Sequence, residues 1–478
     1  MNILFAASEA APFAKVGGLG DVAGSLPAAL RALGHDARLI MPKYRVIPEK
    51  WTRSFEFITN FTVLIGSAYK YVGLFRCVHR GVTVYFLDNE EYFGGDVYGY
   101  DGDGEAERTV FLCRAVCEAL PHTGFAPELI HVNDWQTALI PVLLRRQYPA
   151  LSVKTLLTIH NLRYQGLFGI SQLRALTGLP DDAFTIDGLE FYGGANLLKG
   201  GILYADKVNT VSPHYAAETL TPEYGERLEG VLRSRGADYS GILNGIDYDL
   251  FNPRLDKHIA APYGSRDLSG KTVCKRALAA ELSLDPDKML MTVVSRLVDQ
   301  KGLDILAECA ESLLQDGRCA LIVLGTGEPR YEALFAGLAE RYPAAARALI
   351  RYDAELAQRL YAGSDLLLVP SRFEPCGLTQ LIAMKYGTLP LVRETGGLYD
   401  SVRPYNEQDG SGYGFTFAPY AAHDLEYTVR RAVSFYFDDP ALWQTLVKRA
   451  MRQDFSWKRS AALYAALYEQ ILSGEAVG

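Results

Sequence analysis

The chain has 478 residues, of which 49% are hydrophobic and 22% charged, and its formal net charge is −8. This length and composition are typical of a globular protein with about two to four domains, and they exclude a disordered or fibrous chain. The negative charge disfavours a nucleic-acid partner, because binding a polyanion requires a dense basic surface.

Neither a membrane anchor nor a disulfide framework is expected. No apolar run approaches the ~20 residues that span a bilayer, and the first ten residues lack the basic and apolar regions of a signal peptide, so we expect a cytoplasmic protein. The seven cysteines are odd in number and contain no C-x-x-C pair, which favours reduced thiols over disulfides or a zinc site. They are Cys77, Cys113, Cys117, Cys274, Cys309, Cys319 and Cys376.

The chain opens with a buried strand over Met1–Ala7 and a helix over Gly18–Leu33, joined by a loop of eight to ten residues. The helix start resembles a dinucleotide-binding glycine fingerprint, but the loop is too long and no acidic residue follows the second strand, so NAD is disfavoured. Lys15 beside this glycine-rich start could instead place a cation and several N–H donors near an oxyanion. The alternative is a solvated loop lysine.

Polar side chains follow two later strands of the first half. Asp134 comes after the strand Leu129–Val132, and His160 with Asn161 comes after the strand Thr155–Ile159. The carboxyl ends of strands in an α/β sheet usually open onto the ligand crevice, so we expect a site there. Before them, short alternating runs over residues 51–87 predict β-hairpins.

A boundary is expected near Ser240, after which strands and helices alternate again. The predicted strands and helices of this second half give a second doubly wound α/β unit. They are the helices 271–282, 302–314, 331–341 and 355–362 and the strands 289–295, 320–324, 349–352 and 365–369. Further helices are expected over 424–454, and the tail 457–472 is amphipathic.

Two strand-to-helix loops of the second half contain candidate binding residues. The loop Ser295–Gly302 holds the cations Arg296 and Lys301 at a sheet edge. The stretch Pro370–Gln380 leads from a strand into a helix whose first N–H groups would attract an anion, with Glu374 as its carboxylate. Taken alone, this stretch could be an ordinary turn in which Glu374 caps the helix.

These loops together resemble a known family. The motifs KVGGLGDV (residues 15–22) and SRFEPCGLTQ (residues 371–380) are similar to those of bacterial glycogen synthases and plastid starch synthases. Further similarity covers nearly the whole chain, through HVNDW (131–135), TIHN (158–161), NGID (244–247), SRL (295–297) with KG (301–302), and TGGL (395–398).

The resemblance implies the GT-B fold, with two Rossmann-like domains facing across a cleft. We expect an acceptor-side domain over residues 1–240, a nucleotide-sugar-binding domain over 241–455, and a final helix over 456–478 that returns to the first domain. The implied activity is transfer of glucose from ADP-glucose to an α-1,4-glucan with retention. No cofactor and no metal are expected, and neither a nucleic acid nor a membrane is an expected partner.

The resemblance also assigns residues. Lys15, Arg296 and Lys301 would bind the ADP pyrophosphate, while Glu374 and His160 would stand at the reaction centre. The same motifs imply that a larger set contacts the substrate: Gly18, Asp21, Asp134, Asn161, Asn244, Cys376, Gly377, Leu378 and Thr379. Tyr352 and the nearby Tyr361 are candidates for stacking on adenine, with core packing as the alternative for either.

One position departs from the wider pattern of retaining transferases. Many relatives place a second glutamate eight residues after the first, where this chain has Ile382. The motifs supply no pair of carboxylates about 5 Å apart for double displacement. The resemblance implies a front-face reaction in which Glu374 positions the sugar and the leaving ADP helps to deprotonate the acceptor. The alternatives are UDP-glucose as donor, or a glucan-binding protein without activity.

Overall fold

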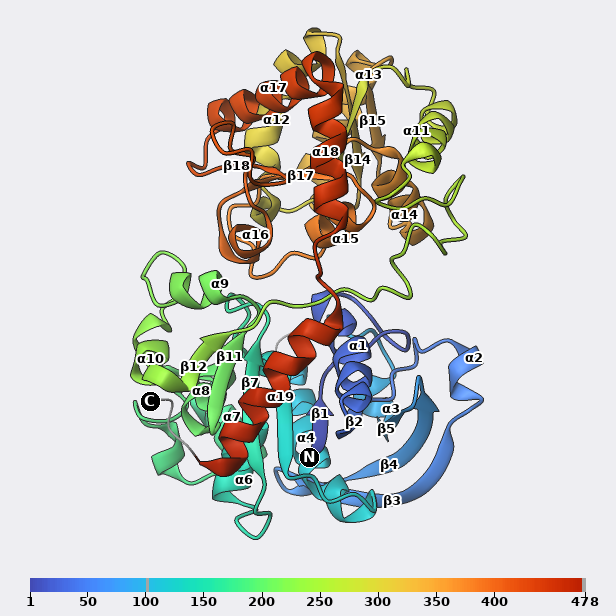
Figure 1. The fold of residues 1–478 in the computed structure, drawn as a ribbon. Coiled ribbons are helices and arrows are strands. Elements are labelled where there is room, and N and C mark those ends of the chain that lie inside the picture. The colour runs from blue at the N-terminus through green and yellow to red at the C-terminus, as the bar shows by residue number, and fades with distance from the viewer. Residues whose placement is uncertain (100–102, 475–478) are drawn as a thin grey trace. The chain divides into compact units, whose positions relative to one another are not determined.

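The structure, a computed structural model, describes residues 1–99 and 103–474, and the chain forms two compact units (Figure 1). Unit 1 comprises Met1–Gly245 and Trp457–Gly478, and unit 2 comprises Ile246–Ser456. The predicted boundary at residue 240 would cut a strand of unit 1, Tyr239–Gly241.

A nine-stranded sheet forms the centre of unit 1, with the strand order β12-β11-β7-β6-β1-β2-β5-β4-β3. All neighbours pair in parallel except β3 with β4 and β4 with β5, which are antiparallel. The strands are β1 (Asn2–Ala6), β2 (Asp36–Pro42), β3 (Glu56–Ile65), β4 (Ala68–His79), β5 (Val82–Asp88), β6 (Leu129–Asn133), β7 (Lys154–Ile159), β11 (Lys207–Thr210) and β12 (Tyr239–Gly241). The predicted hairpins over residues 51–87 are thus confirmed.

Helices cover both faces of this sheet, so its central strands are buried on both sides; Ile3, Leu4 and Phe5 of β1 are fully buried. The helices of unit 1 are α1 (Gly18–Ala32), α2 (Glu49–Thr52), α3 (Glu90–Phe93), α4 (Asp103–Ala119), α5 (Asp134–Thr137), α6 (Leu139–Arg146), α7 (Ile170–Thr177), α8 (Leu197–Tyr204), α9 (Pro213–Glu218), α10 (Glu229–Ser234) and α19 (Trp457–Ser473). A small sheet of β8 (Leu167–Phe168), β10 (Gly194–Asn196) and β9 (Glu190–Phe191) was not predicted.

The C-terminal helix α19 belongs to the core of unit 1. It lies beside α1 and β7 (Figure 1), and the hydroxyls of its buried Tyr464 and Tyr468 meet polar groups of the central strands. The Tyr468 hydroxyl lies 2.8 Å from His131 Nδ1, and the Tyr464 hydroxyl accepts a hydrogen bond from Asn209 Nδ2 at 3.2 Å. The predicted return of the tail to the first domain is confirmed.

Unit 2 is built on a six-stranded, all-parallel sheet with the order β15-β14-β13-β16-β17-β18. Its strands are β13 (Met289–Val294), β14 (Cys319–Leu324), β15 (Ala346–Leu349), β16 (Leu366–Val369), β17 (Leu389–Arg393) and β18 (Phe415–Phe417). Its helices are α11 (Ser269–Glu281), α12 (Leu303–Gln315), α13 (Pro329–Arg341), α14 (Ala354–Gly363), α15 (Thr379–Lys385), α16 (Gly396–Ser401), α17 (Ala422–Asp438) and α18 (Pro440–Met451). The predicted doubly wound α/β order is confirmed.

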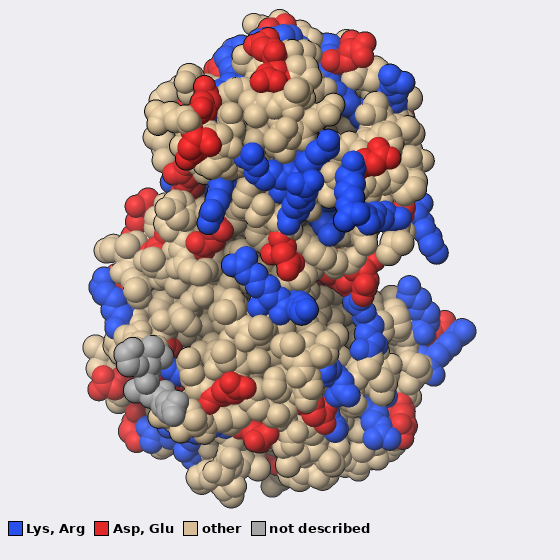
Figure 2. Space-filling view, viewed as in Figure 1, with Lys and Arg blue, Asp and Glu red and all other residues tan. Residues whose placement is uncertain are grey.

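The surface carries charges of both signs. Figure 2 shows Lys and Arg side chains together with Asp and Glu on the visible face of each unit. All seven cysteines are free and buried, so the prediction of unpaired thiols is confirmed. Among the helices in the described parts of the chain, none is long and apolar enough to cross a membrane.

Candidate active site

The predicted site residues of unit 1 follow three neighbouring strands, β1, β6 and β7. Residues Asp134 and His160 stand directly after β6 and β7, and Lys15 lies in the loop after β1. The chain leaves β1 towards β2 on one side, whereas β6 pairs on the other side, so this edge is a topological switch point where open α/β sheets bind ligands.

Asp134 fixes the backbone at the end of β7. Its Oδ1 accepts the backbone N–H of His160 at 2.7 Å and that of Asn161 at 3.4 Å. Its own backbone has φ +56°, a strained conformation for a residue other than glycine that is often found at functional sites. Burial raises the pKa of its carboxyl to about 7 and lowers the pKa of the His160 ring to about 3. His160 is therefore neutral at pH 7.

Glu9 is a residue of this edge that sequence reasoning missed. It is 2% exposed, and its carboxylate accepts hydrogen bonds from the backbone N–H of Val16 and, at 3.0 Å, that of Gly17. Burial raises the pKa of the Glu9 carboxyl. We expected backbone N–H groups of this loop to face a bound oxyanion, but those of Val16 and Gly17 donate to Glu9 instead. Glu9 therefore shapes the glycine-rich loop.

The remaining predicted residues of unit 1 differ in their surroundings. Lys15 Nζ lies 2.7 Å from Asp21 Oδ1, and a Cβ added at Gly18 would meet nothing within 4 Å. Asn244, in the loop after β12, is 5% exposed, and its buried Oδ1 has no hydrogen-bond partner among the described residues. An unpaired buried acceptor is costly, so Asn244 Oδ1 is suited to receive a donor from a ligand.

The switch point of unit 2 lies between β13 and β16, and it holds an ion pair whose carboxylate is buried. Lys301 Nζ lies 2.6 Å from Glu374 Oε2, which also accepts a hydrogen bond from Ser371 Oγ at 3.0 Å. Glu374 is 6% exposed. Gly302, with φ +69°, makes this approach possible, because a Cβ there would lie 1.9 Å from the Pro370 oxygen. The two loops that carry the pair are therefore packed backbone to backbone.

The other predicted residues of unit 2 lie along the same edge, with one exception. Arg296 is exposed, and its Nη2 lies 3.4 Å from Gln300 Oε1. Residues 376–379 follow Glu374, with Gly377 at φ +71°, and they lead into α15. The helix α15 begins only at Thr379, so Pro375 belongs to the loop before it.

Tyr352 is the exception: within unit 2, which the structure describes completely, it makes no hydrogen bond or ring contact with Lys301 or Glu374. Its strand was predicted over 349–352, whereas β15 spans Ala346–Leu349, so Tyr352 lies in the loop beyond it. The side chain is 82% exposed, which excludes core packing, the alternative considered above. Its stacking on adenine stays a prediction.

Two family models match the chain: the starch synthase catalytic domain over residues 2–234 and the glycosyl transferases group 1 over residues 275–438. The glycogen synthase of Anoxybacillus flavithermus is 45% identical over 484 aligned residues, covering 100% of this chain and 99% of the relative. The glycogen synthase of Clostridium acetobutylicum is 47% identical over 480 residues, covering 99% of this chain and 100% of the relative. The chain belongs to the glycogen and starch synthase family.

A solved structure agrees with this assignment. The catalytic domain of starch synthase IV from Arabidopsis thaliana, determined bound to ADP and acarbose, superposes with a TM-score of 0.93 at 34% identity and covers 99% of both chains. The GT-B fold class is thereby confirmed. A sucrose-phosphate synthase from Thermosynechococcus elongatus, at 19% identity and a TM-score of 0.64, shares the fold alone.

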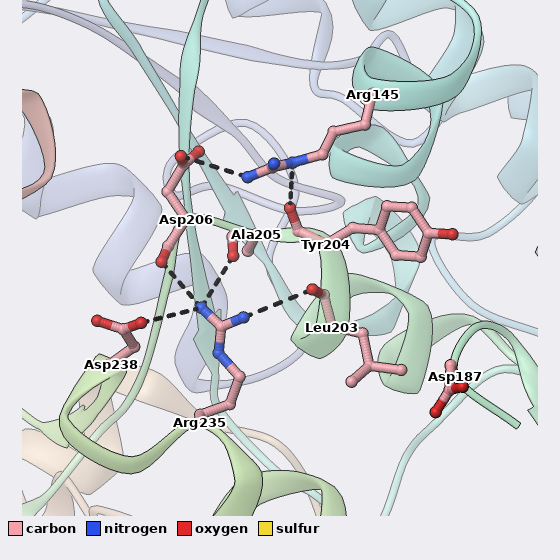
Figure 3. A pocket seen from close by; sticks show the side chains of 8 residues that line it. All are labelled: Arg145, Asp187, Leu203, Tyr204, Ala205, Asp206, Arg235 and Asp238. Carbon is pink, nitrogen blue, oxygen red and sulfur yellow. Dashed lines mark hydrogen bonds and ion pairs between the residues drawn. The ribbon is translucent and has the colours of Figure 1, made fainter. Parts of the chain in front are cut away.

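A recess of about 470 Å³ in unit 1 lies away from these edges (Figure 3). Two residues that line the recess, Asp206 and Asp238, come just before β11 and β12. The recess therefore lies at the amino ends of these strands, whereas the predicted site residues follow the carboxyl ends of β6 and β7. Arg235 donates to the backbone oxygens of Ala205 and Asp206 at the end of α8, and Arg145 pairs with the Asp206 carboxylate. These charges neutralise one another and hold the end of α8.

Among the described residues, no cluster of three or more His, Cys, Asp or Glu side chains is arranged to hold a metal ion. The expected independence from metal stays a prediction.

Proposed function

We propose that this member of the glycogen and starch synthase family transfers glucose from ADP-glucose to the non-reducing end of an α-1,4-glucan, with retention of configuration. The observation that carries the proposal is the ion pair of Lys301 with the buried Glu374 at the switch point of unit 2, with Arg296 on the same strand-to-helix loop as Lys301. The family assignment supports the glucosyl transfer itself, and the ADP bound to the starch synthase IV relative supports the nucleotide.

The pair can contact both parts of the sugar nucleotide, with Lys301 at the phosphate and Glu374 at the glucose. A lysine ammonium has three N–H donors, so Lys301 can keep its bond to Glu374 and still donate to a phosphate oxygen. Together with Arg296 it would stabilise the charge that develops on the departing ADP. The family resemblance also assigns Lys15 of unit 1 to the pyrophosphate, a role that requires its ammonium to leave Asp21.

Glu374 is held in a way that suits orienting a sugar. Its Oε2 accepts hydrogen bonds from both Lys301 Nζ and Ser371 Oγ, and these bonds lower the nucleophilicity of the carboxylate towards an anomeric carbon. A carboxylate held in this manner accepts hydrogen bonds from sugar hydroxyls. We propose that it aligns the glucose while the leaving phosphate takes the proton of the acceptor hydroxyl on the same face, which gives retention.

The donor is tested by competition. Purified protein is given a malto-oligosaccharide primer and equal concentrations of ADP-glucose and UDP-glucose, with one donor radiolabelled at a time. We expect faster incorporation from ADP-glucose and none without primer. Faster incorporation from UDP-glucose would overturn the donor assignment, and no incorporation from either would favour a glucan-binding protein without activity.

A further inference from the structure

The side chain of Asn133 is enclosed between the ends of three central strands of unit 1. It is 1% exposed, and its Nδ2 donates to the backbone oxygen of Ala6, at the end of β1, at 3.1 Å. The same Nδ2 donates to the backbone oxygen of His131 at 3.2 Å. Its Oδ1 lies 3.0 Å from His160 Nε2, just beyond the end of β7. Two of the three amide contacts are therefore to backbone oxygens of the sheet, and the third is to the ring of His160.

The chemistry of these neighbours decides which way the amide faces. Backbone oxygens only accept hydrogen bonds, so the NH₂ group of Asn133 has to face Ala6 and His131. The amide oxygen is then left for His160, and because an amide oxygen can only accept, His160 Nε2 has to donate. A neutral imidazole carries one N–H, so Nδ1 of His160 is left with a lone pair.

The remaining atoms around His160 agree with this tautomer. The ring is neutral because burial lowers its pKa to about 3. Within the described parts of the chain, His160 Nδ1 has no hydrogen-bond partner, and the residue is partly exposed. Its backbone N–H is bonded to Asp134 Oδ1 at 2.7 Å. The backbone and the ring are thus anchored separately, and one acceptor atom is left over.

We propose that Asn133 is a positioning residue that holds His160 as the Nε2–H tautomer, so that Nδ1 is an acceptor for a hydroxyl group of the bound sugar. A lone pair repels a phosphate oxygen, so the ring selects a hydroxyl and leaves phosphate to the cations. The identity of the ligand as a sugar rests on the proposed function. The tautomer does not.

The tautomer is measured directly by two-bond ¹H–¹⁵N spectra of protein labelled with ¹⁵N-histidine. The chain has eight histidines, and the His160 signals are assigned from their loss in His160→Gln. We expect His160 to be in the Nε2–H form and to keep it between pH 5.5 and pH 8. A wild-type His160 in the Nδ1–H form, or one that becomes an imidazolium in this range, would overturn the proposal whether or not the protein is active.

Two variants and a matched control extend the measurement. Asn133→Leu keeps the approximate shape but removes the acceptor, and Asn133→Ala removes the same acceptor with less bulk for the case in which the leucine variant does not fold. Both should populate the Nδ1–H form. Asn209→Leu removes an amide that is equally buried, on β11, bonded to Tyr464 and Thr158 and not to His160. It should leave the His160 spectrum unchanged. If both Asn133 variants keep the wild-type tautomer, Asn133 does not set it.

Kinetics separate positioning from general loss of structure. Because Nδ1 faces a hydroxyl in this account, the Asn133 variants should lower kcat about ten- to a hundredfold and leave the Kd of ADP unchanged. A variant with the altered tautomer but wild-type kcat would overturn the role in the reaction. A protein with the expected tautomer and no transferase activity would instead contradict the proposed function alone.

Discussion

At the scale of single residues, the ion pair of the buried Glu374 with Lys301 is the main feature of the site in unit 2. In Glu374→Gln the amide oxygen can still accept from Ser371 and Lys301, so we expect a folded protein with unchanged ADP affinity. The negative charge that aligns the sugar is lost. Turnover should fall at least about a hundredfold, or ~2.7 kcal/mol of transition-state stabilisation.

The measurement is steady-state glucose incorporation beside calorimetric titration with ADP. Glu340→Gln serves as the matched control, because Glu340 lies on the exposed face of α13 in the same unit. A Glu374→Gln protein with wild-type turnover would remove Glu374 from the site.

Asp134 gives a prediction about pH. Burial raises its pKa from the ordinary 3.8 to about 7, so the folded protein binds this proton more tightly than the unfolded chain. Its contribution to the free energy of unfolding therefore falls as pH rises from about 4 to about 7, and is level above. Asp134→Asn removes this dependence, and asparagine tolerates the positive φ.

The variant should accordingly gain stability over wild type as pH rises from 4.5 to 7.5, by no more than about 4 kcal/mol, the ceiling that the pKa shift sets. Differential scanning calorimetry at both pH values measures this as a growing difference in Tm. A difference in Tm that is the same at both pH values would show that Asp134 does not titrate in this range.

At the scale of elements, the loop that carries Glu374 is held against the start of α16. Gly397 N donates to the Glu374 backbone oxygen at 3.1 Å, and a Cβ at Gly397 would lie 2.2 Å from the Cys376 oxygen. Gly397→Ala must therefore displace one of the two elements. We expect turnover to fall about tenfold or more while the sheet of unit 2 stays folded.

Gly337→Ala is the control for this change. Gly337 lies within α13, where an added Cβ meets only the flexible end of Arg341 at 3.4 Å. Alanine there should stabilise the helix by up to about 1 kcal/mol and leave turnover unchanged. Equal turnover in the two variants would mean that the loop tolerates displacement.

The positions of some strands could be predicted from the sequence, and those of others could not. Strands such as β1, β14 and β16 are short apolar runs, so their positions were predictable. The strand β15 was misplaced by three residues, because Ala-Arg-Ala-Leu has no strong strand signal and its pairing with β14 decides its position. The exposed place of Tyr352 follows from that pairing.

Within the site, the limit of prediction was set by contacts distant in sequence. Glu374 and Lys301 could be named from their motifs, but the distance between them depends on the packing of Gly302 against Pro370. Glu9 gave no signal, since one acidic residue in a loop is ordinary. A buried carboxylate bonded to the loop's own N–H groups becomes visible only once the loop is folded.

At the scale of the whole molecule, the division into units predicts which fragments fold. Unit 1 is discontinuous in sequence, because α19 supplies the buried Trp457, Tyr464 and Tyr468 to its core. We expect a fragment of residues 1–245 to aggregate. A fragment of residues 246–456 contains the complete second sheet and should fold alone.

The control for the fragment of residues 1–245 is a fragment that restores α19, in which residues 1–245 are joined to residues 457–474 through two glycines. The join is short because Ile246 N donates to the Phe455 oxygen at 2.8 Å, so the ends to be joined lie close together. This fragment should show a cooperative thermal transition. A fragment of residues 1–245 that melts equally cooperatively would show that α19 is dispensable for unit 1.

The central claim, that the protein extends an α-1,4-glucan by glucose from ADP-glucose, is tested most directly by the position and linkage of the added sugar. Glucan labelled from ADP-[¹⁴C]glucose is digested with an exo-acting hydrolase that releases maltose from non-reducing ends by cleaving α-1,4 bonds. The account predicts that nearly all label is released as maltose early in the digestion, while total glucan is still largely intact. Label that resists this enzyme, or that appears only as the whole polymer is degraded, would contradict it.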